Sequence, residues 1–194
     1  MKKSNIIMFF AALFPLALFI FPLWNITLEA PQYPTPLGMN IYINDFSDAN
    51  PHDIKNINLM NHYVGMKYIP KSIPEFKIFP LGIILTSILG FIIAFKGSYK
   101  WFFGWFILMI SLSAAGLYDF YLWEHDYGHN LDPKAIMKFT NPDGTAMGFQ
   151  PPIFGTKKIL NFVAHSYPRL GTYFLSLGIA MSFYAFLKGK KEMT

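Results

Sequence analysis

Long apolar runs alternate with two long polar stretches along the chain. The four runs cover about residues 6–24, 78–95, 101–123 and 170–187. Each is close to the roughly 20 residues that a helix needs to cross about 30 Å of hydrocarbon. The pattern therefore predicts an all-α integral membrane protein, in which residues 1–194 form a single membrane domain built on a four-helix transmembrane bundle.

The two polar stretches, about residues 25–77 and 124–169, are rich in aromatic side chains. Disordered segments are typically poor in aromatic residues, so we expect these loops to fold together as an ordered cap above the bundle. The alternation of apolar and polar residues in 39–44 (MNIYIN) allows one short strand there.

Lysines indicate how the bundle lies in the membrane. They flank the chain start, the turn between the second and third runs, and the chain end: Lys2, Lys3, Lys96, Lys100, Lys188, Lys190 and Lys191. These places share one side if four helices alternate in direction, and the positive-inside rule makes that side cytoplasmic. We expect a bacterial inner-membrane protein with both termini in the cytoplasm and both loops in the periplasm. The first run resembles a signal peptide, but its length and Pro31 after the one plausible cleavage point favour an uncleaved anchor.

Composition supports the membrane class and limits the possible chemistry. Only 14% of the residues are charged, whereas about a quarter is usual in a soluble domain. The net charge of +5 is not gathered in one stripe, so we expect the lipid bilayer and no nucleic acid as a partner. The absence of cysteine excludes disulfides and iron–sulfur clusters. No histidine lies inside an apolar run, which argues against haem within the bundle.

The histidines fall in or beside the two polar loops: His52, His62, His125, His129 and His165. In the first loop His62 and Met66 are four positions apart, so one helical turn places both on one face. Met60 is a further thioether nearby. Imidazole and thioether donors suit copper, although a methionine that fills a packing gap is the simpler alternative for this pair.

A second candidate lies just beyond the third apolar run. His125 and His129 are again four positions apart, a spacing that can place two imidazoles on one metal ion. Carboxylates near this pair could accept hydrogen bonds from the rings and fix their orientation; they are Glu124, Asp126 and Asp132. The alternative is a solvated, charge-balanced helix end.

Two further residues complete the candidate site. Asp119 lies about one turn inside the third run, where an ionisable residue is costly and usually functional. It would orient a ligand ring. The alternative is that it lies close enough to the membrane interface to contact water. His165 could supply a ligand from the start of the fourth run, although a hydrogen-bonded interfacial histidine is the simpler interpretation.

Three sequence blocks read like signatures: NHYVGMKYI at 61–69, GLYDFYLWEHDYGHNLDP at 116–133 and NFVAHSYP at 161–168. They resemble a small multi-span membrane protein associated with nitrous-oxide-reductase copper-maturation gene clusters of Bacteroidetes-type bacteria. This resemblance implies a place in the assembly of a periplasmic copper enzyme. The residues that fall within the matching blocks are His62, Met66, Asp119, His125, His129 and His165.

The leading hypothesis is an inner-membrane accessory protein that binds copper on its periplasmic face and assists a periplasmic or membrane protein partner. The expected ligands are His62, Met66, His125 and His129, with Met60 and His165 in reserve. The first alternative is a structural or assembly subunit of a larger membrane (respiratory) complex, without a metal of its own. The second is a copper-dependent membrane oxidase or monooxygenase using Asp119, His125 and His129, which would need a bend because positions 119 and 125 lie about 120° apart around a helix.

Overall fold

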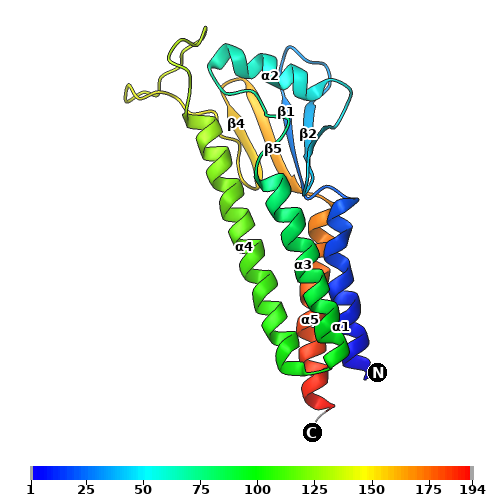
Figure 1. The fold of residues 1–194 in the computed structure, drawn as a ribbon. Coiled ribbons are helices and arrows are strands. Elements are labelled where there is room, and N and C mark those ends of the chain that lie inside the picture. The colour runs from blue at the N-terminus through cyan, green and yellow to red at the C-terminus, as the bar shows by residue number, and fades with distance from the viewer. Residues whose placement is uncertain (1, 193–194) are drawn as a thin grey trace.

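A computed structural model describes residues 2–192 of the chain. The molecule has a helical bundle at one end and a β-sheet with a covering helix at the other (Figure 1). The bundle contains α1 (Lys3–Leu13), the 3-10 helix η1 (Phe14–Phe19), α3 (Glu75–Lys96), α4 (Tyr99–His129) and α5 (Leu170–Lys191). By length and apolar composition, α3, α4 and α5 can each cross a membrane, while α1 and η1 together make a shorter apolar segment. These three helices indicate a membrane location.

The first apolar run does not form one long helix. It begins as α1, tightens into η1 at Phe14 and gives way to a strand at Trp24. Pro15 lies at the start of η1, and Pro22 follows its end. A proline lacks the amide donor that an α-helix needs and clashes with the preceding turn, which favours the end of the α-helix here. The predicted first span of residues 6–24 is therefore shorter as a helix than its apolar length suggests.

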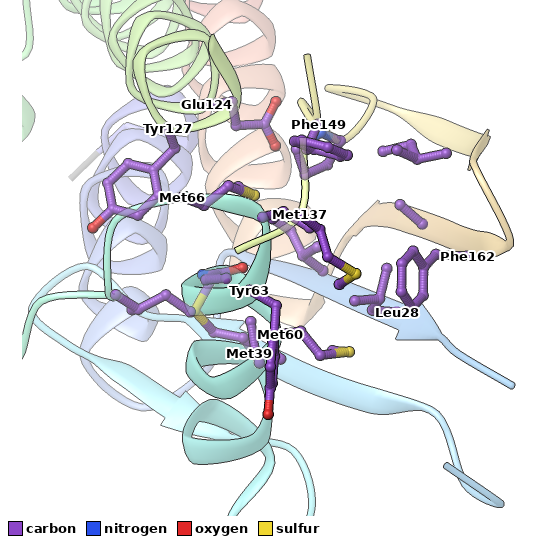
Figure 2. Close-up of a pocket in the computed structure, with 18 of the residues that line it drawn as sticks. Leu28, Met39, Met60, Tyr63, Met66, Glu124, Tyr127, Met137, Phe149 and Phe162 are labelled. Carbon is purple, nitrogen blue, oxygen red and sulfur yellow. The ribbon is translucent and has the colours of Figure 1, made fainter. Parts of the chain in front are cut away.

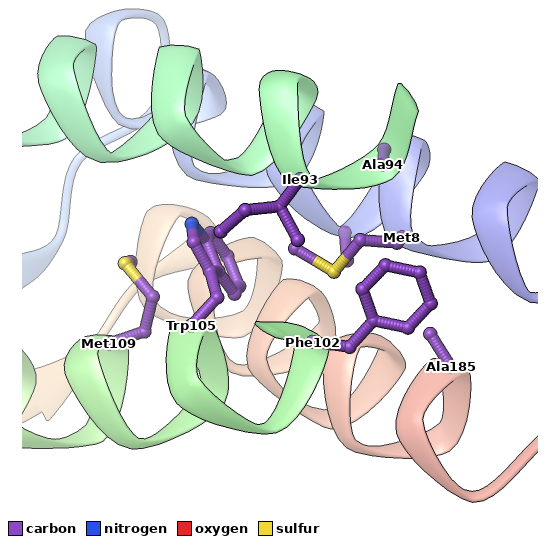
Figure 3. Packing of buried hydrophobic residues seen from close by; sticks show 8 residues of the cluster. Met8, Ile93, Ala94, Phe102, Trp105, Met109 and Ala185 are labelled. Atoms are coloured by element: carbon purple, nitrogen blue, oxygen red, sulfur yellow. The ribbon is translucent and has the colours of Figure 1, made fainter. Parts of the chain in front are cut away.

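The bundle is held by a cluster of buried side chains from α1, α3, α4 and α5 (Figure 3). Met8, Phe102, Trp105 and Met109 are each at most 1% exposed. The indole Nε1 of Trp105 donates a hydrogen bond to the Thr86 carbonyl oxygen at 2.9 Å, which ties α4 to α3. The cluster lies in the half of α4 nearest its start, so the far half of α4 is free to reach the sheet.

Five antiparallel strands form a single sheet in the spatial order β3-β2-β1-β5-β4. They are β1 (Trp24–Glu29), β2 (Leu37–Ile41), β3 (Phe46–Asp48), β4 (Gly155–Ile159) and β5 (Phe162–Pro168). The prediction of an all-α fold is therefore wrong. The strand allowed within 39–44 is present only at 39–41, because β2 begins at Leu37 and ends at Ile41. The sheet as a whole depends on β1 pairing with β5, which joins the two polar loops.

Helix α2 (Asp53–Val64) covers one face of the sheet (Figure 1). The buried Asp53 carboxylate accepts hydrogen bonds from the backbone amides of Gly38 and Asn50, at 2.8 and 2.9 Å, and so fixes the start of α2 against β2. Gly65 ends the helix in the left-handed conformation (φ 80°), which glycine adopts without steric cost. We use the term cap for the sheet, α2 and the segments that join them to one another and to the bundle helices, including residues 130–154 between α4 and β4.

Candidate functional site

An apolar pocket lies in the cap between the sheet, α2 and the outer end of α4 (Figure 2). It encloses about 170 Å³. Ile26 and Leu28 of β1 and Phe162 and Ala164 of β5 form one wall. Since side chains alternate between the two faces of a strand, these residues identify the face of the sheet on which the pocket lies.

Methionine is concentrated in this pocket. Within residues 2–192, four methionines line it, and they come from four separate segments: Met39 of β2, Met60 of α2, Met66 just after α2, and Met137 beyond α4. Figure 2 shows their side chains around the pocket. The Nε2 of Gln32 lies 3.6 Å from the Met60 sulfur. The pocket thus brings soft thioether donors together from positions as far apart as 39 and 137.

Glu124 of α4 is the one acidic residue among the residues that line the pocket within 2–192. It is 1% exposed, and neither carboxyl oxygen has a hydrogen-bond partner among the described residues. A buried polar group without a partner is costly, and a buried charge more so. Glu124 therefore differs from the other residues that line the pocket in having a buried carboxyl with no hydrogen-bond partner among the described residues.

Glu124 lies beyond the membrane-crossing part of α4. The helix has 31 residues and is about 46 Å long at 1.5 Å per residue, whereas hydrocarbon is about 30 Å thick. The last turns of α4 therefore extend into the cap. There, burial raises the pKa of the Glu124 carboxyl to about 8, an effect that the positive charge of Lys157 opposes.

The chain segment around Gln150 covers Glu124. A Cβ atom added to Gly128, one turn after Glu124, would lie 2.5 Å from the Gln150 Cα and N atoms. The Phe149 amide donates a hydrogen bond to the Gly128 carbonyl oxygen at 2.8 Å. Glycine at 128 therefore lets a second backbone lie directly against α4, one turn from the buried carboxyl, and Phe149 of that segment lines the same pocket as Glu124.

The predicted pair His125 and His129 lies together but outside the pocket. Their rings stack with centroids 4.3 Å apart, and the His129 Nδ1 donates to the His125 carbonyl oxygen at 3.0 Å. Both residues are exposed, whereas Glu124 and Gly128, each one position earlier, are buried. The helix thus turns the histidine pair toward the surface and the glutamate toward the pocket.

The other two predicted histidines lie elsewhere on the cap. His62 is exposed, and its ring is nearly parallel to that of Tyr68, with 6.1 Å between centroids. His165 alternates with Ala164 and so lies on the sheet face opposite the pocket. Its Nδ1 is 2.8 Å from the Thr156 Oγ1 and its Nε2 is 3.2 Å from the Glu29 Oε1.

The remaining carboxylates predicted beside the metal ligands have other surroundings. Asp126 forms an ion pair with Lys67 at 2.7 Å, and hydrogen bonds from Lys67 and Asn130 lower its pKa. Asp132 accepts a hydrogen bond from the Lys134 amide at 2.8 Å. Asp119 is half-buried on α4. Across residues 2–192, no group of three or more His, Asp or Glu side chains is placed to hold a metal ion.

Two of the pocket methionines, Met60 and Met66, are among the ligands predicted from the sequence, and Glu124 was predicted only as a support for a histidine ring. Met39 and Met137 were not predicted. The alternating pattern around Met39 was the one local signal that this side chain faces a core. Comparisons with protein-family models, with curated proteins and with solved structures find no match for this chain.

Proposed function

We propose that this protein is a membrane-anchored accessory protein that binds Cu(I) in the methionine-lined pocket of its cap. One observation carries the proposal: a buried carboxyl without a hydrogen-bond partner, Glu124, shares the pocket with four methionine side chains. The ligand set differs from the one expected from sequence, because the histidines do not line this pocket.

The donor chemistry fits a soft monovalent cation. Thioether sulfur is a soft neutral ligand that selects Cu(I) among the biological metals. A single carboxylate supplies the charge that balances one Cu⁺ in a low-dielectric pocket, where an isolated ion of either sign is unfavourable. Met60, Met66, Met39 and Met137 are the candidate thioether ligands, and Glu124 is the candidate counter-ion.

Two simpler explanations account for only part of the site. Methionine often fills irregular gaps in a core, and an apolar molecule could occupy a pocket of this size. Neither explanation provides a partner for the Glu124 carboxyl, which remains buried and unsatisfied in both. A cation held between sulfur and carboxylate accounts for the methionines and for the glutamate together.

The biological setting of the proposal comes from the sequence. The lysine distribution favours a periplasmic cap on a bacterial inner-membrane protein. The resemblance of the blocks at 61–69, 116–133 and 161–168 to a protein of copper-maturation clusters supports a role in the assembly of a periplasmic copper enzyme. We therefore expect the protein to hold Cu(I) for a periplasmic or membrane protein partner.

The test is an anaerobic titration of the detergent-purified protein with Cu(I) against a chromophoric chelator. We expect one Cu(I) per chain, and an affinity at least tenfold lower in a double variant with Met60→Leu and Met66→Leu. Met109→Leu is the matched control, because it makes the same change in the buried bundle cluster, away from the pocket. Equal affinity in the wild type and the double variant would overturn the proposal.

A second function, a structural subunit of a larger membrane complex, is favoured by the exposure of α4. No residue from 110 to 123 is buried, and Ser111 and Asp119 lie within this stretch, where contact with lipid is costly. The chain has no cysteine, so Ala115→Cys introduces a single cross-linking site on this stretch. A specific adduct with one membrane protein in intact membranes would support the subunit role, and labelling by lipid-soluble reagents alone would contradict it.

A further inference from the structure

A second cavity lies on the other side of Met66. This polar cleft has a volume of about 410 Å³ and lies between the end of α2 and the segment that follows α4. His62, Lys67 and Asn130 are among the residues that line it. Within residues 2–192, Met66 is the one residue that lines both the cleft and the methionine-lined pocket.

The cleft is built by short backbone contacts. The Asp132 amide donates to the Gly65 carbonyl oxygen at 2.8 Å, and the Met137 amide donates to the Tyr63 carbonyl oxygen at 2.9 Å. A Cβ atom on Gly65 would lie 2.8 Å from the Ala135 Cβ. These contacts hold the segment after α4 against the end of α2, and they carry Met137 into the pocket.

A short segment that lines the cleft carries a polar imidazole, His62, at one end and a thioether, Met66, at the other. His62 in the last turn of α2 is exposed, and Met66 after the Gly65 turn is half-buried. The ring of His62 lies parallel to that of Tyr68, which limits its orientation. Lys67 is engaged by Asp126. His62 is therefore the imidazole available at the outer side of the Met66 wall.

We infer that this cleft is the port through which Cu(I) enters and leaves the pocket, with His62 as the first ligand and Met66 as the ligand shared between port and pocket. The inference rests on the proposed function. In the step, the His62 imidazole binds the ion, the Met66 sulfur then replaces it, and further thioethers complete the site. Copper remains Cu(I) throughout, and the proton held by the buried Glu124 carboxyl leaves to solvent as the ion enters the pocket.

This role differs in kinetics from that of a resident ligand. A transient ligand lowers the barrier in both directions, so its removal slows uptake and release by the same factor and leaves the equilibrium affinity unchanged. A resident ligand mainly changes the affinity. His62 and Met66 should therefore respond differently, although they lie four positions apart.

The experiment measures both quantities on the full-length protein in detergent, with Cu(I) supplied as its complex with a chromophoric chelator. In stopped-flow mixing, we expect His62→Ala and His62→Gln to slow both loading and removal at least tenfold, with the dissociation constant unchanged within twofold. Lys134→Ala, in the same cleft but without a copper ligand, and His129→Ala should behave as wild type.

The possible failures are distinguishable. Tight Cu(I) binding by the wild type with unaltered rates in both His62 variants would overturn the port and leave the proposed function standing. A large loss of affinity in the His62 variants would also overturn the port, because His62 would then be a resident ligand. If the wild type does not bind Cu(I), the proposed function fails and the port with it.

Discussion

The indole of Trp105 lies directly against the backbone of Gly90. A Cβ atom added to Gly90 would be 2.9 Å from the Trp105 Nε1 and 2.6 Å from the Ala12 Cβ. The same indole nitrogen donates to the Thr86 carbonyl oxygen. Three helices, α1, α3 and α4, thus approach one another at a position where the chain has no side chain.

We expect Gly90→Ala to lower the free energy of unfolding by about 1–3 kcal/mol, because the added methyl group overpacks this contact. Gly82→Ala is the control on the same helix, since nothing lies within 4 Å of a Cβ atom there. The measurement is thermal unfolding in detergent, followed by circular dichroism. Equal midpoints for the two variants would show that α1 and α4 do not meet α3 as described.

The buried Glu124 carboxyl makes stability depend on pH. Its pKa is raised from the ordinary value near 4.5 to about 8 in the folded protein, so the folded state retains a proton that the unfolded state has lost. The contribution of this group to the free energy of unfolding is therefore largest below about pH 4.5, and it falls as the pH rises toward 8.

Thermal unfolding of the metal-free protein should show this decline between pH 5 and pH 9. Glu124→Gln should flatten it, because the amide does not ionise. Asp132→Asn, which changes an exposed carboxylate of the cap, should keep the pH dependence of the wild type. An unchanged pH profile in Glu124→Gln would mean that the carboxyl is solvated rather than enclosed.

The contact between Gly128 and Gln150 should control access to Glu124. Gly128→Ala forces two backbones apart, because the new Cβ atom would lie 2.5 Å from the Gln150 Cα and N atoms. We expect a loss of about 1–3 kcal/mol in stability and faster hydrogen exchange of the Phe149 amide. Gly116→Ala, on the same helix with nothing within 4 Å, should change neither. Normal exchange at Phe149 in Gly128→Ala would contradict the close approach.

His165 should have no part in copper binding, because it lies on the sheet face opposite the pocket. His165→Ala removes the contacts with Thr156 and Glu29, and exposed pairs of this kind contribute about 1 kcal/mol or less. We expect a small change in the unfolding midpoint and the wild-type affinity for Cu(I) within twofold in the chelator competition. A tenfold loss of affinity would return His165 to the metal site.

The absence of cysteine allows a direct test of topology. We expect Asp143→Cys, in the cap, to react with a membrane-impermeant maleimide in cells whose outer membrane has been opened. Lys188→Cys, in the last turn of α5, should react only after the inner membrane is also permeabilised. The reverse pattern would place the cap in the cytoplasm and contradict the positive-inside interpretation.

The long helices could be predicted from the sequence because apolar composition over about 20 residues is a local property. The sheet could not, because its central pairing joins Trp24 to Pro168, and nothing local in either segment specifies a partner so far along the chain. Trp24 illustrates the difficulty: it ends an apolar run in the sequence, yet it begins a strand in the structure.

Only part of the candidate site could be predicted, because some of its contacts are local in the sequence and others join distant segments. Spacing along a helix correctly placed His125 and His129 on one face, because that relation is local. Which face is buried depends on the segment around Gln150, which returns to cover α4. Glu124, one position before His125, therefore became the buried group, and Met137 reached the pocket by a path that no local pattern indicates.

The two sides of the pocket are attached to different parts of the bundle. The amides of Arg169 and Gly171 donate to the carbonyl oxygens of Leu23 and Pro22, at 2.8 and 2.9 Å, where β5 enters α5 and η1 leads into β1. The sheet is therefore attached directly to the first and last helices, whereas Glu124 belongs to α4. We expect a tilt of α4 relative to those two helices to alter the width of the pocket, so that its fit for an ion depends on how the helices sit in the membrane.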